Sequence, residues 1–412
     1  MRIKKIKIKD FKGISLLEFN PKKINLIIGK NNTGKTSVLE AIDLLFNPDE
    51  INQRYPEHIS DIISVGSKYS ELTATLFYKK NAIKVKISKA DEIEVIYNFK
   101  KDLIDVLIDS LKEGRKKNKM EITEETKHEL LSKIDEWITP ELRSNILKRS
   151  ILLVKDEKNK IVKYQLRPSI EEVYTGLEII LENLYKYFKN KFGLNIFRSH
   201  ELLRFRLLRE IYRGGTKHKK SKKKEVILIK NLLRTGIEQE EKNQEIQKRI
   251  LDIESIIKEH NLIENLERLD FDYVVFKDGS ERISIPFSFL GDGFKAIVYL
   301  LWSLSSTNLK NKIVLLDEPE THMHPGYIKE LIKILIKFSD ELNIQFFITT
   351  HSGDFIDALF NENFSPEEQK YLEKELLILR MEKIDNQNLS EFLDYNEAKY
   401  TKDELLFDLR GN

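Results

Sequence analysis

Residues 29–36 read Gly-Lys-Asn-Asn-Thr-Gly-Lys-Thr, which is a complete G-x-x-x-x-G-K-[ST] phosphate loop. Residues 24–28 before it form a short apolar run typical of a buried strand, and residues 35–46 after it have the apolar spacing of a helix. A glycine-bearing loop between a strand and a helix start directs backbone N–H groups and the positive end of the helix dipole at one anion. The stretch therefore predicts a phosphate-binding site.

Two side chains of the loop have specific expected roles. We expect Lys35 to reach the β- and γ-phosphates of a nucleotide and the Thr36 hydroxyl to be a ligand of Mg²⁺. The alternative, a chance glycine turn before a helix, is disfavoured because strand, loop and helix all agree. The candidate nucleotide-binding residues of this segment are Gly29, Lys30, Asn31, Asn32, Thr33, Gly34, Lys35, Thr36 and Ser37.

A second apolar strand, at residues 312–316, ends in the two carboxylates Asp317 and Glu318. If this strand is buried and brings Asp317 beside Thr36, the two side chains complete the Mg²⁺ site. Glu318 is then placed to accept the proton of the attacking water. Two exposed carboxylates at a strand end are the alternative interpretation of this pair when it is taken alone.

A third strand, at residues 344–350, is followed by His351. A lone histidine is more often structural, but this strand lies one helix beyond the strand that carries Asp317. We therefore expect His351 to sense the γ-phosphate through a hydrogen bond. Glu318 and His351 are the two candidate catalytic residues.

The composition of the 412-residue chain narrows its class. There are 70 Lys+Arg against 67 Asp+Glu, so a net charge of +3 neither demands nor excludes a nucleic-acid partner. The absence of cysteine excludes disulfides, thiolate zinc sites and cysteine nucleophiles, and suits a reducing cytosol. Residues 1–9 alternate apolar and basic side chains, as a strand does, and no segment has the roughly 18–20 apolar residues of a membrane span. We expect a soluble, cytoplasmic protein without a membrane partner.

Three segments differ in their sequence character. Residues 1–100 read as strands around the phosphate loop, and residues 101–270 as a mainly helical insertion with a hairpin at 151–166 and an unpackable basic loop at 213–224. In residues 271–412, strands and helices alternate. The expected fold class is α/β: a P-loop ATPase head with a mixed sheet, formed by the two end lobes, and a helical insertion between them.

The long separation of Asp317 from the phosphate loop decides the P-loop class. In compact GTPases and small kinases this aspartate follows the loop closely, whereas a long insertion fits ABC-type ATPases of the SMC/RecF kind. Four stretches resemble that group, including its OLD-like branch, often labelled AAA ATPases. They are the opening at 6–14, the loop and helix at 29–40, the D-E-P-E-x-x-L-H-P-like string at 317–325, and the histidine switch at 350–352. Residues 90–280 carry no recognisable part of the resemblance.

The resemblance implies ATP and Mg²⁺ as ligands, and a signature loop that closes over the ATP of a second subunit. The matching stretch is 289–295, in which Gly291, Gly293 and Lys295 are candidate nucleotide contacts. Gly291 stands where the family's serine usually contacts the γ-phosphate. The missing hydrogen bond would ordinarily contribute about 1.5–3 kcal/mol, so dimer closure is expected to be weaker. A plain Gly-Asp-Gly turn is the alternative. For the glutamine that contacts Mg²⁺ in this family, Gln53 and the region of Arg198-Ser199 are open candidates.

The leading hypothesis is a slow ATPase that forms a head-to-tail homodimer, or a higher oligomer, around two ATP–Mg²⁺ and switches a partner. About sixty residues follow His351, too few for the TOPRIM nuclease of many OLD-like relatives. The resemblance then implies a separately encoded effector, such as a nuclease or toxin in defence against phage.

Two other functions are weighed against it. An ATP-gated DNA-binding protein is suggested by a basic stretch, although a solvated surface loop explains that stretch equally well. The stretch holds Arg204, Arg206, Arg209, Arg213 and the lysine run to Lys224. The motor subunit of a membrane transporter is disfavoured because such motors carry a serine in the signature and lack the Phe-Lys-Gly opening.

Overall fold

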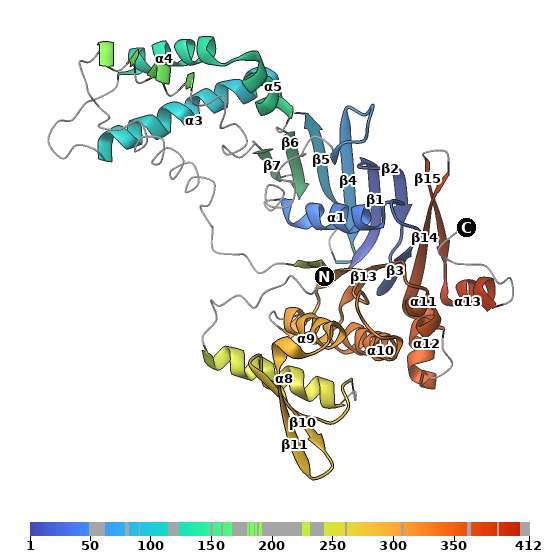
Figure 1. Cartoon of the computed structure of the whole chain (residues 1–412). Helices are drawn as coiled ribbons and strands as arrows, with labels where there is room; N and C mark the ends of the chain where they lie inside the picture. The colour runs from blue at the N-terminus through green and yellow to red at the C-terminus, as the bar shows by residue number, and fades with distance from the viewer. Residues whose placement is uncertain are drawn as a thin grey trace. The chain divides into compact units, whose positions relative to one another are not determined.

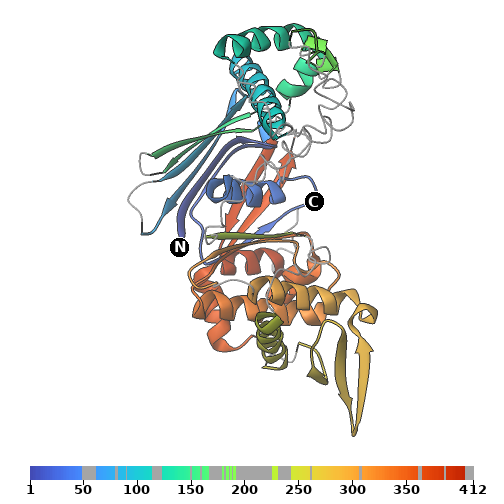
Figure 2. The ribbon, with the colours of Figure 1, turned by 90° about the vertical axis from the view of Figure 1, so that its left-hand side faces the viewer.

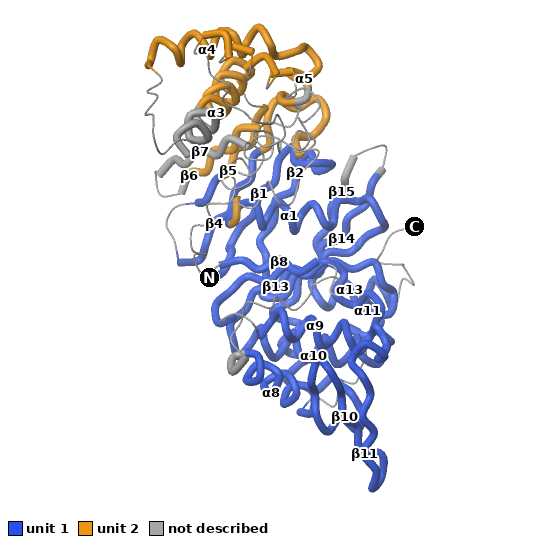
Figure 3. The backbone as a smooth tube through the Cα atoms, turned by 60° about the vertical axis from the view of Figure 1, so that its left-hand side comes forward, with its two compact units in different colours: residues 1–46, 71–84, 225–412 blue, residues 47–70, 85–224 orange. Residues whose placement is uncertain are grey.

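The computed structural model of the chain forms two compact units (Figure 3). The first comprises residues 1–46, 71–84 and 225–412, and the second residues 47–70 and 85–224. The described residues are 1–48, 62–78, 82–89, 91–113, 123–148, 151–157, 160–166, 179–180, 182–184, 186–187, 189–191, 225–230, 243–259, 262–305, 309–360, 364–384 and 387–403. Within these ranges, no helix combines the length and the apolar character needed to span a lipid bilayer.

The core of the first unit is a six-stranded sheet in the order β15-β14-β3-β13-β12-β8, in which only the edge strand β15 is antiparallel to its neighbour. Its strands are β3 (Ile24–Ile28), β8 (Val226–Lys230), β12 (Ile313–Asp317), β13 (Gln345–Thr350), β14 (Leu376–Ile384) and β15 (Gln387–Leu393). The registers pair Asp317 with Thr349 on one side and with Lys230 on the other. The carboxyl ends of neighbouring strands therefore meet at one edge of the sheet, where ligands bind in such folds.

Helices cover both faces of this sheet (Figure 1). Strands β3 and β13 are buried along their whole length, which explains their continuous apolar sequences. On one face lies α1 (Lys35–Phe46), in contact with β8, β12 and β13. Residues of the opposite face, such as Leu26, Leu316 and Ile348, share a core with the other helices. Those helices are α8 (Asn243–Glu259), α9 (Asp292–Ser305), α10 (Pro325–Glu341), α11 (Gly353–Leu359) and α12 (Pro366–Glu375).

Further antiparallel strands and a last helix complete the first unit. Strands β1 (Ile3–Phe11) and β2 (Ile14–Phe19) pair with each other, and β1 also pairs with β4 (Tyr69–Leu76). A projecting ribbon is visible in Figure 2 and leads into α9. It consists of β9 (Leu266–Arg268), β10 (Tyr273–Asp278) and β11 (Glu281–Pro286), followed by the short helix η4 (Phe287–Phe289). Helix α13 (Tyr395–Asp403) packs beside β14 and β15.

The second unit is built from helices and strands. Helix α3 (Glu92–Glu113) packs against α4 (Glu124–Trp137) and α5 (Pro140–Lys148). The Thr123 side chain accepts a hydrogen bond from the backbone N–H of Thr126 and thereby caps α4. Strands β5 (Ile83–Lys89), β6 (Ile151–Glu157) and β7 (Lys160–Leu166) follow one another in the sheet order. The antiparallel pairing of β6 with β7 confirms the predicted hairpin.

Several details differ from the sequence expectations. The unit boundaries differ from the expected divisions at residues 100 and 270, because β8 is hydrogen-bonded to β12 inside the central sheet and belongs to the first unit. Strand β8 was missed in the sequence, as was β15. The last described helix begins at Tyr395. The basic loop at 213–224 and the arginines before it, as well as Gln53 and Arg198-Ser199, lie outside the described residues.

Candidate nucleotide-binding site

The phosphate loop connects β3 to α1, and its backbone explains its glycines. A Cβ atom on Gly29 would collide with the carbonyl oxygen of Met381 in the neighbouring strand β14, so only glycine fits. Gly34 has φ +97°, and Asn32 has φ +64°, a left-handed conformation that asparagine tolerates better than most residues. The loop is therefore held in an unusual backbone path directly before the N-terminus of α1.

The Lys35 side chain folds back onto the phosphate loop. Its ammonium group donates hydrogen bonds to the carbonyl oxygens of Gly29 at 2.8 Å and Lys30 at 2.9 Å, and the residue is only 5% exposed. Burial lowers the pKa of Lys35, and the carboxylates at the end of β12 partly oppose this shift. The candidate phosphate-binding cation thus interacts with the carboxylates of residues 317–320, as the P-loop interpretation requires.

Thr36 and Asp317 lie together at the carboxyl edge of the sheet. The Thr36 hydroxyl donates to the Asp317 carboxylate at 3.0 Å, and the Thr349 hydroxyl donates to the same Oδ1 at 2.7 Å. A hydroxyl and a carboxylate are hard oxygen donors of the kind that Mg²⁺ takes when phosphates and water supply its other ligands. Among the described residues, no group of three or more His, Asp or Glu could hold a metal by itself. The donor set fits a metal ion that binds together with a nucleotide.

Glu318 has a strained backbone and a fixed neighbour. Its φ of +50° is unusual for a residue with a side chain and costs on the order of 1–3 kcal/mol. Its backbone N–H donates to the carbonyl and the hydroxyl of Thr349, both at 3.1 Å. The carboxylate lies 2.8 Å from Nδ1 of His351, and the two side chains are 32% and 48% exposed. This turn presents both candidate catalytic side chains to solvent, beside the half-buried Asp317 and the buried Thr349.

The string that follows Glu318 folds into a tight turn with one buried acid. Glu320 is 5% exposed, and one of its oxygens accepts a hydrogen bond from the Thr350 hydroxyl. Burial raises the pKa of Glu320 to about 7. The string ends at His324, which caps α10 through its Nδ1 atom, and Pro325 starts that helix. The sequence assigned no role to Glu320, because its burial follows only from the fold.

Glu40 forms a second charged cluster behind the phosphate loop. This residue of α1 is 8% exposed and accepts from Lys12, in the turn between β1 and β2, and from Lys230 at 2.6 Å. Burial alone would raise the pKa of Glu40, but the two ammonium groups outweigh it and hold that pKa below its usual range. The cluster ties α1 to the end of β8. The sequence did not reveal it, because Lys230 lies 190 positions away.

The signature stretch lies at the start of α9, on the sheet face opposite α1 (Figure 1). A Cβ atom on Gly293 would lie 2.9 Å from the His322 carbonyl oxygen, so this glycine has a packing reason of its own. A Cβ atom on Gly291 would have no heavy atom within 4 Å. The Lys295 ammonium nitrogen lies 3.6 Å from Oδ1 of Asp292. Among the described residues, no hydrogen bond or ion pair joins Gly291, Gly293 or Lys295 to the phosphate loop.

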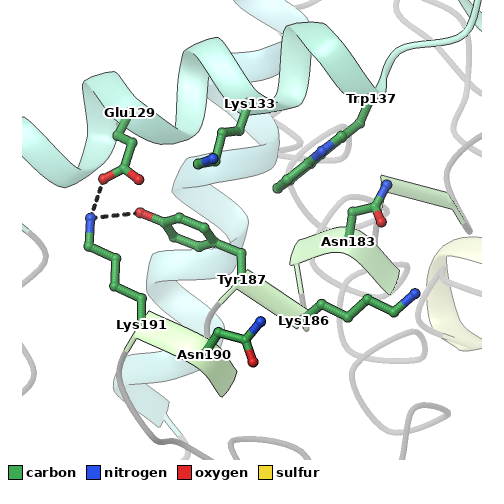
Figure 4. Close-up of a pocket in the computed structure, with 8 residues that line it drawn as sticks. All are labelled: Glu129, Lys133, Trp137, Asn183, Lys186, Tyr187, Asn190 and Lys191. Carbon is green, nitrogen blue, oxygen red and sulfur yellow. Dashed lines mark hydrogen bonds and ion pairs between the residues drawn. The ribbon is translucent and has the colours of Figure 1, made fainter.

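The second unit contains a hollow of about 490 Å³ between α4 and residues 183–191 (Figure 4). Trp137 and Tyr187 line it together with three lysines. Lys191 is paired with Glu129, and Lys186 lies 2.8 Å from Glu182. Most of the positive charge is thus balanced by nearby carboxylates, and we assign no ligand to this hollow.

Comparison with known proteins agrees with this geometry. A family model described as AAA ATPase domain matches residues 1–356, so the chain belongs to this family of ATPases. The chain is 33% identical over 123 residues to an uncharacterized protein of Methanocaldococcus jannaschii, a match that covers 30% of this chain and 100% of that protein. It is 34% identical over 86 residues to an ATP/GTP phosphatase of Helicobacter pylori, covering 20% and 22% of the two chains.

Two further similarities concern the SMC/RecF group. DNA replication and repair protein RecF of Francisella tularensis subsp. novicida is 33% identical over 90 residues, which is 20% of this chain and 26% of RecF. The SMC head domain from Thermotoga maritima matches 96% of this chain and 100% of its own, with 12% identity and a TM-score of 0.43. The chain spans only about a quarter of the RecF relative. The family match confirms the predicted AAA-labelled ATPase class, and the similarity to RecF over a fifth of the chain agrees with its SMC/RecF-like part.

Proposed function

We propose that this protein binds ATP with Mg²⁺ at the phosphate loop and hydrolyses it slowly. The observation that carries the proposal is the convergence of Thr36 and Asp317 at 3.0 Å, with Lys35 folded over the adjoining loop. In this assignment Lys35 exchanges its contacts with loop carbonyls for the β- and γ-phosphates, and Thr36 and Asp317 hold the metal ion. Mg²⁺, when bound, would neutralise charge on the phosphates.

Glu318 accepts the proton of the attacking water, and His351 orients the Glu318 carboxylate. The 2.8 Å contact between Nδ1 of His351 and the Glu318 carboxylate supports these two roles. A carboxylate aligned by an imidazole accepts a proton from a defined direction. The strained φ of Glu318 supports it as well, since strain of this kind clusters at functional sites.

A second copy of the chain completes the site. The signature residues Gly291, Gly293 and Lys295 begin a helix on the face opposite α1, so we assign them to the ATP of a partner in a head-to-tail homodimer or higher oligomer. Opening and closing of this dimer would then control a partner effector, such as a separately encoded nuclease or toxin, with anti-phage defence as the proposed setting.

Phosphate release from ATP tests the hydrolytic role. The wild-type protein should release phosphate with Mg²⁺ and not in its absence. Glu318→Gln should lower turnover by roughly 10²–10⁴, the usual size of a lost general base, while binding of a fluorescent ATP analogue survives. Turnover unchanged in Glu318→Gln would remove Glu318 from this role.

DNA is the alternative partner. The similarity to a DNA replication and repair protein supports this second candidate function. A basic segment that neutralises phosphates would give an affinity for duplex that falls steeply with salt. Deletion of residues 214–224, followed by measurement of duplex affinity at two salt concentrations, tests this. Equal affinities for the deleted and intact chains would exclude the segment as a DNA contact.

A further inference from the structure

Glu320 is a buried acid that the proposed reaction does not use. It is 5% exposed, and its Oε1 atom accepts a hydrogen bond from the Thr350 hydroxyl. Its Oε2 atom is buried and has no hydrogen-bond partner among the described residues. A buried polar atom of this kind is costly, so its presence calls for an explanation. The same burial raises the pKa of Glu320 to about 7.

The Thr350 hydroxyl links Glu320 to the residues on both sides of His351. Thr350 is fully buried at the end of β13, and its Oγ1 atom also accepts a hydrogen bond from the backbone N–H of Ser352 at 3.0 Å. Ser352 in turn caps α11 by accepting from the N–H of Phe355. His351 therefore lies between two anchored residues, while its own side chain is 48% exposed and gains little from packing.

We propose that Glu320 is a positioning residue for His351, acting through the Thr350 hydroxyl to fix the backbone that aims the imidazole at Glu318. This inference rests on the proposed function, since the aim of His351 matters only if its imidazole aligns the Glu318 carboxylate for proton acceptance. Glu320 touches neither the substrate nor the reacting atoms.

The direction of the hydrogen bonds explains why an acceptor is needed at position 320. A hydroxyl has one proton to donate and lone pairs to accept with. When Glu320 takes the proton of Thr350, a lone pair of the same oxygen remains to meet the Ser352 N–H. Without the acceptor, the hydroxyl is free to rotate, and its lone pair is no longer held toward the Ser352 N–H, which weakens the anchor on the far side of His351. An amide oxygen supplies the same acceptor, so glutamine should suffice.

Four variants separate this role from a general contribution to stability. Glu320→Gln keeps an acceptor, Glu320→Leu removes it, and Thr350→Val removes the hydroxyl while keeping the β-branched shape that suits a strand. Ser339→Ala is the matched control. Ser339 is also fully buried, and its hydroxyl bonds to the Ile344 carbonyl and to Tyr371.

ATP turnover and ATP affinity are measured on each variant, and so are the NMR signals of the His351 imidazole. The His351 signals are assigned among those of the eight histidines by their loss in His351→Asn. Glu320→Leu and Thr350→Val should lower turnover by roughly 10- to 100-fold at unchanged ATP affinity, and both should shift the His351 signals. Glu320→Gln and Ser339→Ala should leave both readouts near wild type, although Ser339→Ala melts at a lower temperature.

The NMR readout does not depend on ATP hydrolysis, so the inference and the proposed function fail separately. A wild-type protein without ATP turnover would overturn the proposed function, whereas His351 signals unchanged in Thr350→Val would overturn the positioning role. Wild-type turnover in Thr350→Val would overturn it too. If Glu320→Leu does not fold, Thr350→Val still decides the question.

Discussion

The Thr36 hydroxyl and the Asp317 carboxylate lie 3.0 Å apart although 281 positions separate them in the chain. The first residue belongs to the helix after the phosphate loop and the second to the end of β12. Between them in the sequence lie the whole second unit and the ribbon that precedes α9. In the proposed function, a metal ion that binds here together with a nucleotide would be held by residues from distant parts of the chain.

Loss of the Thr36 hydroxyl should lower the affinity for Mg²⁺ without affecting the fold. Thr36→Val keeps the shape of the side chain, and we expect apparent Mg²⁺ affinity in the turnover assay to fall by at least about 10- to 100-fold. Thr36→Ser retains the hydroxyl and is the matched control. If the Mg²⁺ titrations of Thr36→Val and Thr36→Ser coincide, Thr36 is not a metal ligand.

Removal of the Lys35 ammonium should abolish nucleotide binding itself. The group is buried among loop carbonyls beside the carboxylates at the end of β12, and no other lysine of the phosphate loop is buried in this way. Lys30→Ala is the control, because the Lys30 side chain is exposed. Titration with a fluorescent ATP analogue should give wild-type affinity for Lys30→Ala and no saturable binding for Lys35→Ala. Retained affinity in Lys35→Ala would refute the phosphate-loop assignment.

Glu320 should make the protein less stable as the pH rises. Burial raises the pKa of Glu320 to about 7 from the 4.5 of an ordinary glutamate, so between these pH values the folded state binds more protons than the unfolded state. Its contribution to stability is therefore full below pH 4.5 and lost above pH 7. Relative to Glu320→Gln, the wild-type free energy of unfolding should fall by about 2–3 kcal/mol from pH 5 to pH 8.

Urea unfolding of the two proteins at several pH values checks this prediction, because all other titrating groups cancel in the difference. Glu341→Gln, at an exposed glutamate, is unfolded in the same way as the control for the substitution itself. A wild-type curve parallel to that of Glu320→Gln would mean that Glu320 titrates normally.

A serine at position 291 should strengthen the ATP-dependent dimer. A Cβ atom there meets nothing within 4 Å, so Gly291→Ser should fold without strain. A restored hydrogen bond to the γ-phosphate would contribute about 1.5–3 kcal/mol, which is roughly a 10- to 100-fold tighter dimer. Gly293→Ser is the contrasting variant, because its Cβ atom would press on the His322 carbonyl and lower the melting temperature. Dimer affinity unchanged by Gly291→Ser, measured by analytical ultracentrifugation with ATP, would place Gly291 away from the γ-phosphate.

The sequence predicted the parts of the fold in which local pattern and burial agree. Strands β3, β12 and β13 are continuous apolar runs, and their polar ends point to the site because parallel strands present their carboxyl ends at one edge. Strand β8 escaped detection because its five residues lie between basic and polar stretches, and its place in the sheet is set by pairing with β12.

The polar contacts around the site depend on tertiary structure. The Lys12–Glu40–Lys230 cluster joins three distant segments, and the burial of Glu320 arises only when its turn packs against the end of β13. Periodicity carries no signal for such contacts. The packing reason for Gly293 is of the same kind, since it requires the path of the chain around His322.

The solution mass of the Glu318→Gln protein, with and without ATP and Mg²⁺, shows whether each ATP is held by the phosphate loop of one copy and covered by the signature stretch of another. The variant should have the mass of one chain without nucleotide and of two or more chains with ATP–Mg²⁺, and Lys35→Ala should remain a single chain throughout. A Glu318→Gln protein that binds ATP to saturation and stays a single chain would show that no second copy is needed to complete the nucleotide site.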